Sequence, residues 1–284
     1  MRPPLQLSLV VPAFNEEKRL RQMLIDAATY LRGRGAAFEL IVVDDGSRDG
    51  TSPLVCNLAE RDIPELRLIR LPANRGKGFA VRAGVLNAAG ELVLFADADG
   101  ATPIRELERL EAAIGAGADI AIGSRELRTD DVAIQARWHR RVIGRIFHGL
   151  VRSMVLRGVL DTQCGFKLFR GEVAQDLFSR MRIDGFCFDV ELLAMAKRRG
   201  YRIAETAVNW MDRPGSRVNL VRDSLRMARD LIVIRTLVLR GTYDEPGVHV
   251  LLETTDRVPV YGLRALRWHV PERHAMSPPD GAAG

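Results

Sequence analysis

The sequence is poor in cysteine and contains no long apolar run. Three cysteines, Cys56, Cys164 and Cys187, lie far apart among 284 residues and form no C-x-x-C pair. This spacing argues against a zinc site and favours a reduced, cytosolic protein. No run of about 18 uncharged apolar residues occurs, so we expect no helix that spans a membrane. Residues 1–6 have no apolar core, and we therefore expect no signal peptide.

A glycine-rich dinucleotide motif is also absent. G-x-G-x-x-G does not follow the first apolar run, residues 7–11, where a pyrophosphate would need close backbone approach. This absence argues against a dehydrogenase of the usual dinucleotide-binding type. Residues 74–78, Asn-Arg-Gly-Lys-Gly, lack Walker A spacing, so they form no P-loop. They can still present backbone N–H groups and positive charge to an anion, although a plain capping loop is the alternative.

The charge balance is basic. Lysine and arginine total 42 against 36 acidic residues, which gives a formal net charge of +6 and makes an anionic partner plausible. The cations lack the interleaved aromatic residues of a single-strand binding surface. A basic nucleic-acid-binding protein therefore has only net charge in its favour, and we expect no nucleic-acid partner.

Strand and helix patterns alternate along the first 125 residues. Residues 16–33 have helical spacing with Leu20, Leu24 and Leu31 on one face, and Asn15 is expected to cap this helix. This alternation predicts an α/β fold, a mostly parallel sheet with helices on both faces. The expected strands are 7–11, 38–43, 66–71, 92–96 and 120–122, and the expected helices are 16–33, 50–60, 77–89 and one from Pro103.

Helical patterns dominate beyond residue 130. The expected helices are 137–158, 171–181, 188–199 and about 218–240, with strands at 202–208, 248–252 and 258–262. The last dozen residues are rich in Pro, Gly, Ala and Ser, so we expect them to be disordered.

Carboxylates follow two of the expected strands directly. Asp44 and Asp45 end the second strand, and Asp97 and Asp99 end the fourth. Open parallel sheets bind ligands at the carboxyl ends of their strands. Two carboxylates one residue apart suit a divalent cation, because Mg²⁺ takes one or two carboxylates together with substrate phosphates. A solvated turn is the alternative reading of the pair, since Asp is a common turn former.

Seven short motifs together resemble the family 2 glycosyltransferases, which have the GT-A fold. These motifs are PAFNEE at 12–17, DDGS at 44–47, NRGKG at 74–78, DAD at 97–99, GSR at 123–125, DTQCGFKLF at 161–169 and FDVELL at 188–193. The last two are similar to the dolichyl-phosphate β-glucosyltransferase branch, a relative of the polyprenyl-phosphate glycosyltransferases. The resemblance implies one domain over 1–240, with a nucleotide-binding half to about 125, an acceptor half over 126–240 and an extension over 241–284.

The resemblance also implies roles for individual residues. Asp97, Asp99 and Arg125 would be catalytic, with Asp99 and Asp97 holding Mg²⁺ or Mn²⁺. The residues implied to bind the donor are Pro12, Ala13, Glu16, Asp44, Asp45, Lys77, Asp97, Arg213, Ser216 and Arg217. Ala101 stands where mannose synthases of this group carry a glutamine ligand, so we expect the cation to depend on the diphosphate and water.

The implied reaction moves a hexose, glucose from UDP-glucose, onto a polyprenyl or dolichyl phosphate with inversion. A phosphate acceptor is already an anion at pH 7, so we assign no general base. Alternatives are a GDP-mannose donor or a hydroxyl acceptor. A hydroxyl acceptor would need a base, for which Asp161, Asp189 and Glu191 are the candidates.

An arginine stripe lies on the expected helix 137–158. Arg137, Arg141, Arg145, His148 and Arg152 fall on one side of the helix. A solvated face is one reading. The other is a basic surface that meets anionic headgroups, with Arg137, Arg141 and Arg125 receiving the lipid phosphate. On this second reading we expect a peripheral protein on the cytoplasmic face of a membrane.

Overall fold

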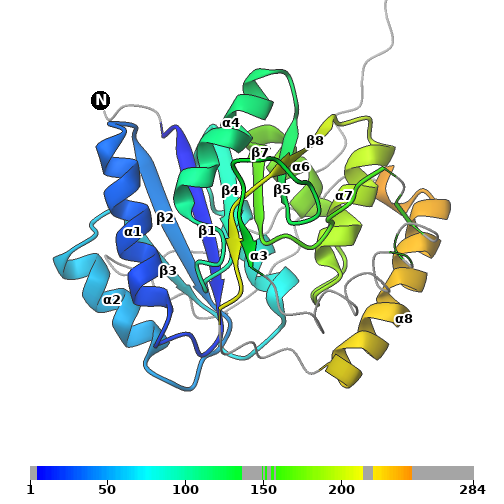
Figure 1. Cartoon of the computed structure of the whole chain (residues 1–284). Coiled ribbons are helices and arrows are strands. Elements are labelled where there is room, and N and C mark those ends of the chain that lie inside the picture. The colour runs from blue at the N-terminus through cyan, green and yellow to red at the C-terminus, as the bar shows by residue number, and fades with distance from the viewer. Residues whose placement is uncertain are drawn as a thin grey trace, which may run out of the picture.

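A seven-stranded mixed sheet forms the centre of the structure, which is a computed structural model (Figure 1). The model describes residues 5–135, 149, 151, 155–156, 158–213 and 220–244, without the side chains of 135 and 220–225. The strand order is β3-β2-β1-β4-β7-β5-β8. The strands are β1 (Leu7–Ala13), β2 (Phe38–Asp44), β3 (Leu66–Arg70), β4 (Leu92–Ala96), β5 (Ile120–Ser124), β7 (Phe166–Arg170) and β8 (Ile203–Ala207). A two-residue strand β6 (Ile134–Gln135) pairs with β9 (Trp210–Met211) in a second small sheet.

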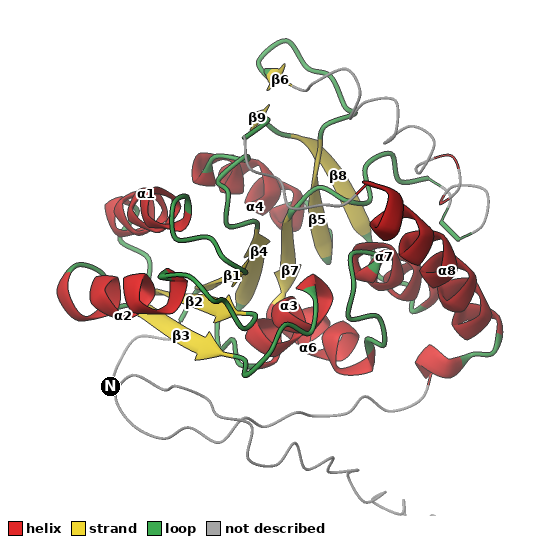
Figure 2. Ribbon diagram, turned by 90° about the horizontal axis from the view of Figure 1, so that it is seen from below, coloured by secondary structure: helices red, strands yellow, loops and turns green. Residues whose placement is uncertain are grey.

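Helices cover both faces of the sheet (Figure 2). One face packs on α1 (Leu20–Gly33), α2 (Thr51–Arg61) and α4 (Leu107–Gly115). The other face packs on α3 (Lys77–Leu86), α6 (Gly171–Arg180), α7 (Phe188–Arg198) and α8 (Leu220–Leu239). Short 3-10 turns occupy Ile104–Glu106, before α4, and Thr242–Asp244, after α8. No helix among the described residues is both long and apolar enough to cross a bilayer.

The predicted α/β class is confirmed, and the core follows the expected pattern. The strands β1 and β2 are buried over their whole length, as strands covered on both faces of a sheet should be. On α1 the residues Leu20, Leu24 and Leu31 are buried as the helical spacing predicts. Residues 248–252 and 258–262, expected as strands, and the expected helix 137–158, apart from a few single positions, lie outside the described residues.

Two local features differ from the prediction. Asn15 does not cap α1: the helix begins at Leu20, and Arg19 occupies the capping position. Instead Asn15 has a positive φ of 55°, donates its N–H to Ser47 Oγ (2.7 Å) and accepts the Arg48 N–H (2.8 Å). Its side chain therefore joins the loop after β1 to the loop after β2.

The strand β7 is the second difference. It runs antiparallel to both of its neighbours, β4 and β5, and the sequence pattern does not predict it. Lys167 interrupts its apolar pattern, although this side chain is completely buried. Its charge is met by Asp189, with 2.5 Å between Nζ and Oδ1. A buried cation with a partner from α7 is a tertiary feature that the pattern of a single strand cannot reveal.

Candidate active site

A cavity of about 950 Å³ lies at the carboxyl ends of the strands. The loops that follow β1, β2, β4 and β5 all reach it, because these strands run parallel. The predicted site residues that line it are Pro12, Ala13, Glu16, Asp45, Lys77, Asp97, Asp99 and Arg125. The fold thus brings together in one cavity residues that are spread over more than a hundred positions of the chain.

Asp97 is held from two sides. Its Oδ1 lies 2.7 Å from the Lys77 Nζ, and its backbone N–H donates to the Gly165 carbonyl (3.0 Å). Burial opposes the charge of Lys77, but the carboxylates of Asp97 and Asp189 outweigh this effect and raise the pKa of the lysine. Gly165 packs so closely that a Cβ there would meet Asp97 Oδ2 at 2.0 Å. The position of this carboxylate is therefore fixed by a cation and a glycine.

Asp99 has the environment of a ligand for a hard cation. Its Oδ1 accepts the Ala101 N–H (3.0 Å), and its Oδ2 lies 4.0 Å from an Arg19 Nη1. Burial and the neighbouring charge of Asp97 raise the pKa of Asp99, so a cation close to it would be favourable. In the described part of the chain, no three acidic, histidine or cysteine side chains are grouped so that they could hold a metal ion together. One or two carboxylates fit Mg²⁺ or Mn²⁺ that shares its coordination with substrate phosphates and water.

Arg19 is a cavity residue that the sequence did not single out. Its Nε donates to Glu16 Oε2 (2.7 Å), and its Nη2 pairs with the other oxygen of the same carboxylate. The Glu16 N–H is in turn fixed by Thr51 Oγ1 (2.8 Å). Arg19 falls at the start of a helical pattern, where an arginine is read as a solvated side chain.

Asp45 organises the loop 74–78. Its two carboxylate oxygens accept the backbone N–H groups of Arg75 (2.7 Å) and Gly76 (2.9 Å). Burial raises the pKa of Asp45 to about 6, against the lowering effect of these two hydrogen bonds. Gly76 has a φ of 111°, a conformation that glycine adopts readily, and α3 begins directly after it. The loop thus delivers Lys77 to the cavity wall.

Asp44 is placed differently from its neighbour. Its side chain is fully buried, accepts the Ser47 N–H (2.8 Å) and bonds the Ser52 hydroxyl. It is not among the residues that line the cavity. Asp44 therefore shapes the loop after β2, while Asp45 faces the cavity.

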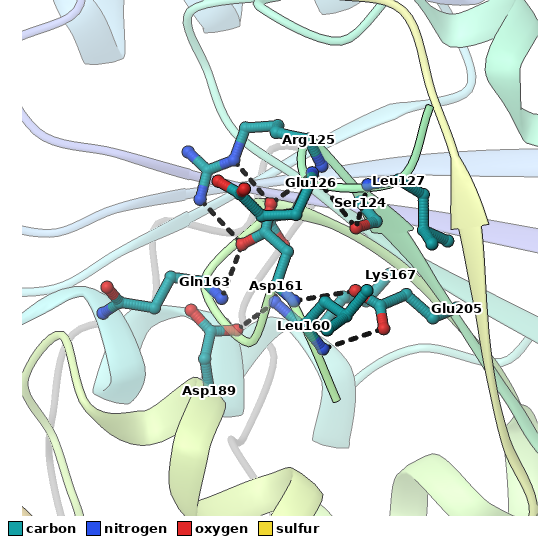
Figure 3. Close-up of polar contacts among 11 residues, drawn as sticks. Ser124, Arg125, Glu126, Leu127, Leu160, Asp161, Gln163, Lys167, Asp189 and Glu205 are labelled. Atoms are coloured by element: carbon teal, nitrogen blue, oxygen red, sulfur yellow. Dashed lines mark hydrogen bonds and ion pairs between the residues drawn. The ribbon is translucent and has the colours of Figure 1, made fainter. Parts of the chain in front are cut away.

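Arg125 is anchored to Asp161 (Figure 3). Its Nε and Nη2 donate to the two oxygens of this carboxylate at 2.7 and 2.8 Å, and its own N–H adds a third bond (2.9 Å). The guanidinium carbon lies 5.6 Å from the centre of the Trp210 ring. Burial lowers the pKa of Arg125, but Asp161 raises it by more, so the side chain stays cationic. Trp210 lines the cavity too and, lying in a two-residue strand, gave no sequence pattern.

The three acids named as candidate bases form hydrogen bonds or ion pairs with groups of the protein. Asp161 binds Arg125, and Asp189 binds Lys167. Glu191 accepts the N–H groups of Arg182 and Ile183, both at 2.8 Å, and burial raises its pKa to about 7. All three are buried, and none lines the cavity.

Of the remaining predicted residues, the structure describes only Arg213. Arg213 is exposed and is not part of its lining. Arg137, Arg141, Ser216 and Arg217 lie outside the described residues. The helix α8, by contrast, supplies three cavity residues that were not predicted, Arg226, Met227 and Asp230.

Known proteins resemble this chain in sequence and in fold. Residues 8–178 match the family model of glycosyl transferase family 2. A dolichyl-phosphate β-glucosyltransferase of Homo sapiens is 40% identical over 253 residues, which are 85% of this chain and 78% of the relative. One of Saccharomyces cerevisiae is 38% identical over 257 residues, 84% of this chain and 76% of the relative.

Solved structures share the arrangement of the elements. Glucosyl-3-phosphoglycerate synthase of Mycobacterium tuberculosis in complex with UDP matches with a TM-score of 0.61 at 21% identity, covering 86% of this chain and 82% of that chain. The same enzyme with Mn²⁺, UDP and phosphoglyceric acid matches with a TM-score of 0.58 at 21% identity, covering 86% and 81%. At 21% identity these matches show that the fold is shared and no more than that.

Proposed function

This chain belongs to glycosyl transferase family 2 and is a glycosyltransferase; on that basis we propose that it transfers glucose from UDP-glucose to a polyprenyl phosphate of the dolichyl type. The observation that carries the proposal is the agreement of two findings. Relatives that span most of the chain are named for this reaction, and residues from six of the seven sequence motifs line one cavity. Acceptor phosphate oxygen bonds to the anomeric carbon, the bond from that carbon to UDP breaks, and the configuration inverts.

The donor would lie along the loops after β1 and β2. Pro12 and Ala13 give a flat, buried wall at the end of β1, and Asp45 and Glu16 offer carboxylate oxygens to the nucleoside. Lys77 pairs with Asp97 in the cavity lining, where its positive charge would face the diphosphate or the sugar. Asp44 does not face the donor but fixes the loop after β2 by accepting the Ser47 N–H.

Asp99 would hold a divalent cation, with Asp97 beside it. Such a cation, when bound, supplies positive charge that stabilises the departing diphosphate. The chain contributes the fixed placement of these carboxylates, through the Ala101 N–H for Asp99 and through Lys77 and Gly165 for Asp97. Arg19 adds a further cation at the same wall.

The acceptor would approach from the side of Arg125. The guanidinium of Arg125 is permanently charged and suits a phosphate. A phosphate monoester is largely ionised at pH 7, its second pKa lying near 6, so the nucleophile needs no base. The commitment of Asp161, Asp189 and Glu191 to other partners supports a phosphate acceptor over a hydroxyl acceptor.

A membrane surface is the natural place for a polyprenyl acceptor. The helix α8 borders the cavity through Arg226 and Met227, and it exposes Ile232 (58%) and Leu239 (75%) among arginines. Apolar and basic side chains on one exposed helix suit an interface with anionic lipid. We propose peripheral attachment at the cytoplasmic face, with the cavity open toward the lipid phosphate.

The test is direct transfer with the purified full-length chain. UDP-[¹⁴C]glucose is incubated with Mn²⁺ and dolichyl phosphate in detergent, and radiolabel is measured in the organic phase. We expect label to move into that phase and to require both the lipid phosphate and the metal. GDP-[¹⁴C]mannose and dolichol, which has a hydroxyl in place of the phosphate, serve as comparison substrates. Faster transfer from GDP-mannose, or to dolichol, would overturn the proposal.

A further inference from the structure

Glu205 lies behind the cavity wall and fixes the chain at Asp161. It comes from β8, opposite Ile122 in the neighbouring strand β5. Its two carboxylate oxygens accept two successive backbone N–H groups, that of Leu160 (2.9 Å) and that of Asp161 (2.7 Å) (Figure 3). One side chain of a regular strand thereby holds the irregular segment that carries Asp161.

Asp161 passes this constraint on to Arg125. The Oδ2 of Asp161 accepts the backbone N–H (2.9 Å) and the Nε (2.7 Å) of Arg125. Its Oδ1 accepts the Nη2 of the same arginine (2.8 Å) and the N–H of Gln163 (3.2 Å). Because Asp161 is completely buried, a shift of its carboxylate away from these donors would leave buried polar groups unsatisfied.

Arg125 consequently has little freedom. Both its backbone and its guanidinium are tied to one carboxylate, and the guanidinium packs on Trp210. The bidentate pair uses Nε–H and one Nη2–H of the five N–H donors of the guanidinium. Among the contacts of the described residues, the other three donors are left for an anion in the cavity that Arg125 lines.

We propose that Glu205 is a positioning residue for the transfer reaction and that it acts on Arg125 through Asp161. Without the two bonds to Glu205, the peptide at Leu160 and Asp161 shifts, the carboxylate of Asp161 moves with it, and the guanidinium no longer points its remaining donors at the anion. The inference deepens the proposed function, on which it rests, because it names what aligns the arginine with the phosphate groups. Glu205 itself touches neither substrate.

The variant Glu205→Gln tests the first link. The amide keeps one acceptor oxygen but presents an NH₂ group to the other backbone N–H, so one hydrogen bond becomes a clash of donors. Misplacement of a reacting or binding group by about 1 Å can cost on the order of 100-fold in rate. We expect kcat with dolichyl phosphate to fall about 10- to 100-fold, with the KM for UDP-glucose unchanged.

Asp119→Asn is the matched control. Asp119 also uses a carboxylate oxygen to accept a backbone N–H, that of Arg202 (2.8 Å), the residue directly before β8. This bond lies at the opposite end of β8 from the cavity. Asp119→Asn should therefore leave kcat within about two-fold of the wild-type value, and the Tm of both variants is measured alongside kcat.

A double-mutant cycle with Arg125→Lys separates positioning from general support. Lysine keeps the charge but cannot form the bidentate pair. If Glu205 acts through Arg125, then Glu205→Gln should lower kcat by less than about two-fold in the Arg125→Lys background. Equal losses in both backgrounds would overturn the proposal, and so would a Glu205→Gln variant with wild-type kcat. Failure of the wild-type chain itself to glucosylate dolichyl phosphate would instead refute the proposed function, so the two failures are distinct.

Discussion

Removal of one charge from the buried pair Lys167–Asp189 should destabilise the folded protein more than removal of both charges. The lysine is completely buried, the aspartate side chain is 3% exposed, and Nζ lies 2.5 Å from Oδ1. Deleting one partner of such a pair leaves an uncompensated buried charge, which costs about 3–5 kcal/mol. For a chain of this size the Tm then falls by on the order of 10 °C. Lys167→Met is the first variant.

The double variant Lys167→Met/Asp189→Leu replaces both charges with apolar side chains of similar shape. What remains is the carbonyl of Cys164, which loses the bond from Nζ (2.5 Å). An unsatisfied buried acceptor costs about 1–3 kcal/mol. The double variant should therefore be more stable than Lys167→Met, although less stable than the wild-type protein.

The pH dependence provides a second check. Burial raises the pKa of Asp189, and Lys167 lowers it, so the pKa rises further when the lysine is removed. A carboxyl with a raised folded-state pKa gives stability that is present at acid pH and lost as the pH rises through that pKa. The deficit of Lys167→Met should thus be larger at pH 8 than at pH 5. Equilibrium urea unfolding of the single and double variants at both pH values measures this.

Two results would refute the reasoning. One is a double variant no more stable than Lys167→Met, which would mean that packing of the lysine stem, not its charge, dominates. The other is a deficit that is the same at pH 5 and pH 8, which would mean that Asp189 stays ionised without its partner.

Three further predictions concern the cavity and the far side of the core. Gly165→Ala should lower kcat by about 100-fold or more with little change in Tm, because the new Cβ displaces the Asp97 carboxylate; unchanged kcat would contradict the close contact. Asp99→Asn should raise the Mn²⁺ concentration for half-maximal transfer by about ten-fold or more, and an unaltered metal titration would exclude it as the ligand. Tyr243→Phe removes a buried 2.8 Å bond to Glu191 and should cost about 1–2 kcal/mol in urea unfolding. Because the pKa of Glu191 is raised to about 7, that cost should be larger at pH 8 than at pH 5, and the reverse order would contradict it.

Much of the fold could be predicted because its physical cause is local. The strands β1, β2 and β4 are short and mostly apolar, and a helix follows each of them in the chain. The cavity could be anticipated for the same reason, since parallel strands carry the acids that follow them to a single edge. Asp45, Asp97 and Asp99 meet there as expected.

The rest depends on contacts between distant residues. Nothing local distinguishes Asp44 from Asp45. Asp44 is buried and accepts the Ser47 N–H, whereas Asp45 lines the cavity. Asp161 looked like a candidate base, but its partner, Arg125, lies 36 positions away in sequence. The sequence does not predict β7, because a lysine within a strand indicates an exposed position. Lys167 can be buried only because Asp189, from another part of the chain, pairs with its charge.

The reversed direction of β7 has a consequence for how acceptor specificity can change. The chain leaves the cavity edge after β5 at Arg125 and returns to it at Asp161, and β7 then runs back into the middle of the sheet. The ion pair between these two residues ties together the ends of the intervening segment. The strand β4, which presents Asp97 and Asp99 at its end, lies outside that segment. We expect exchange of residues 126–160 between relatives to transfer acceptor preference while the donor side stays intact.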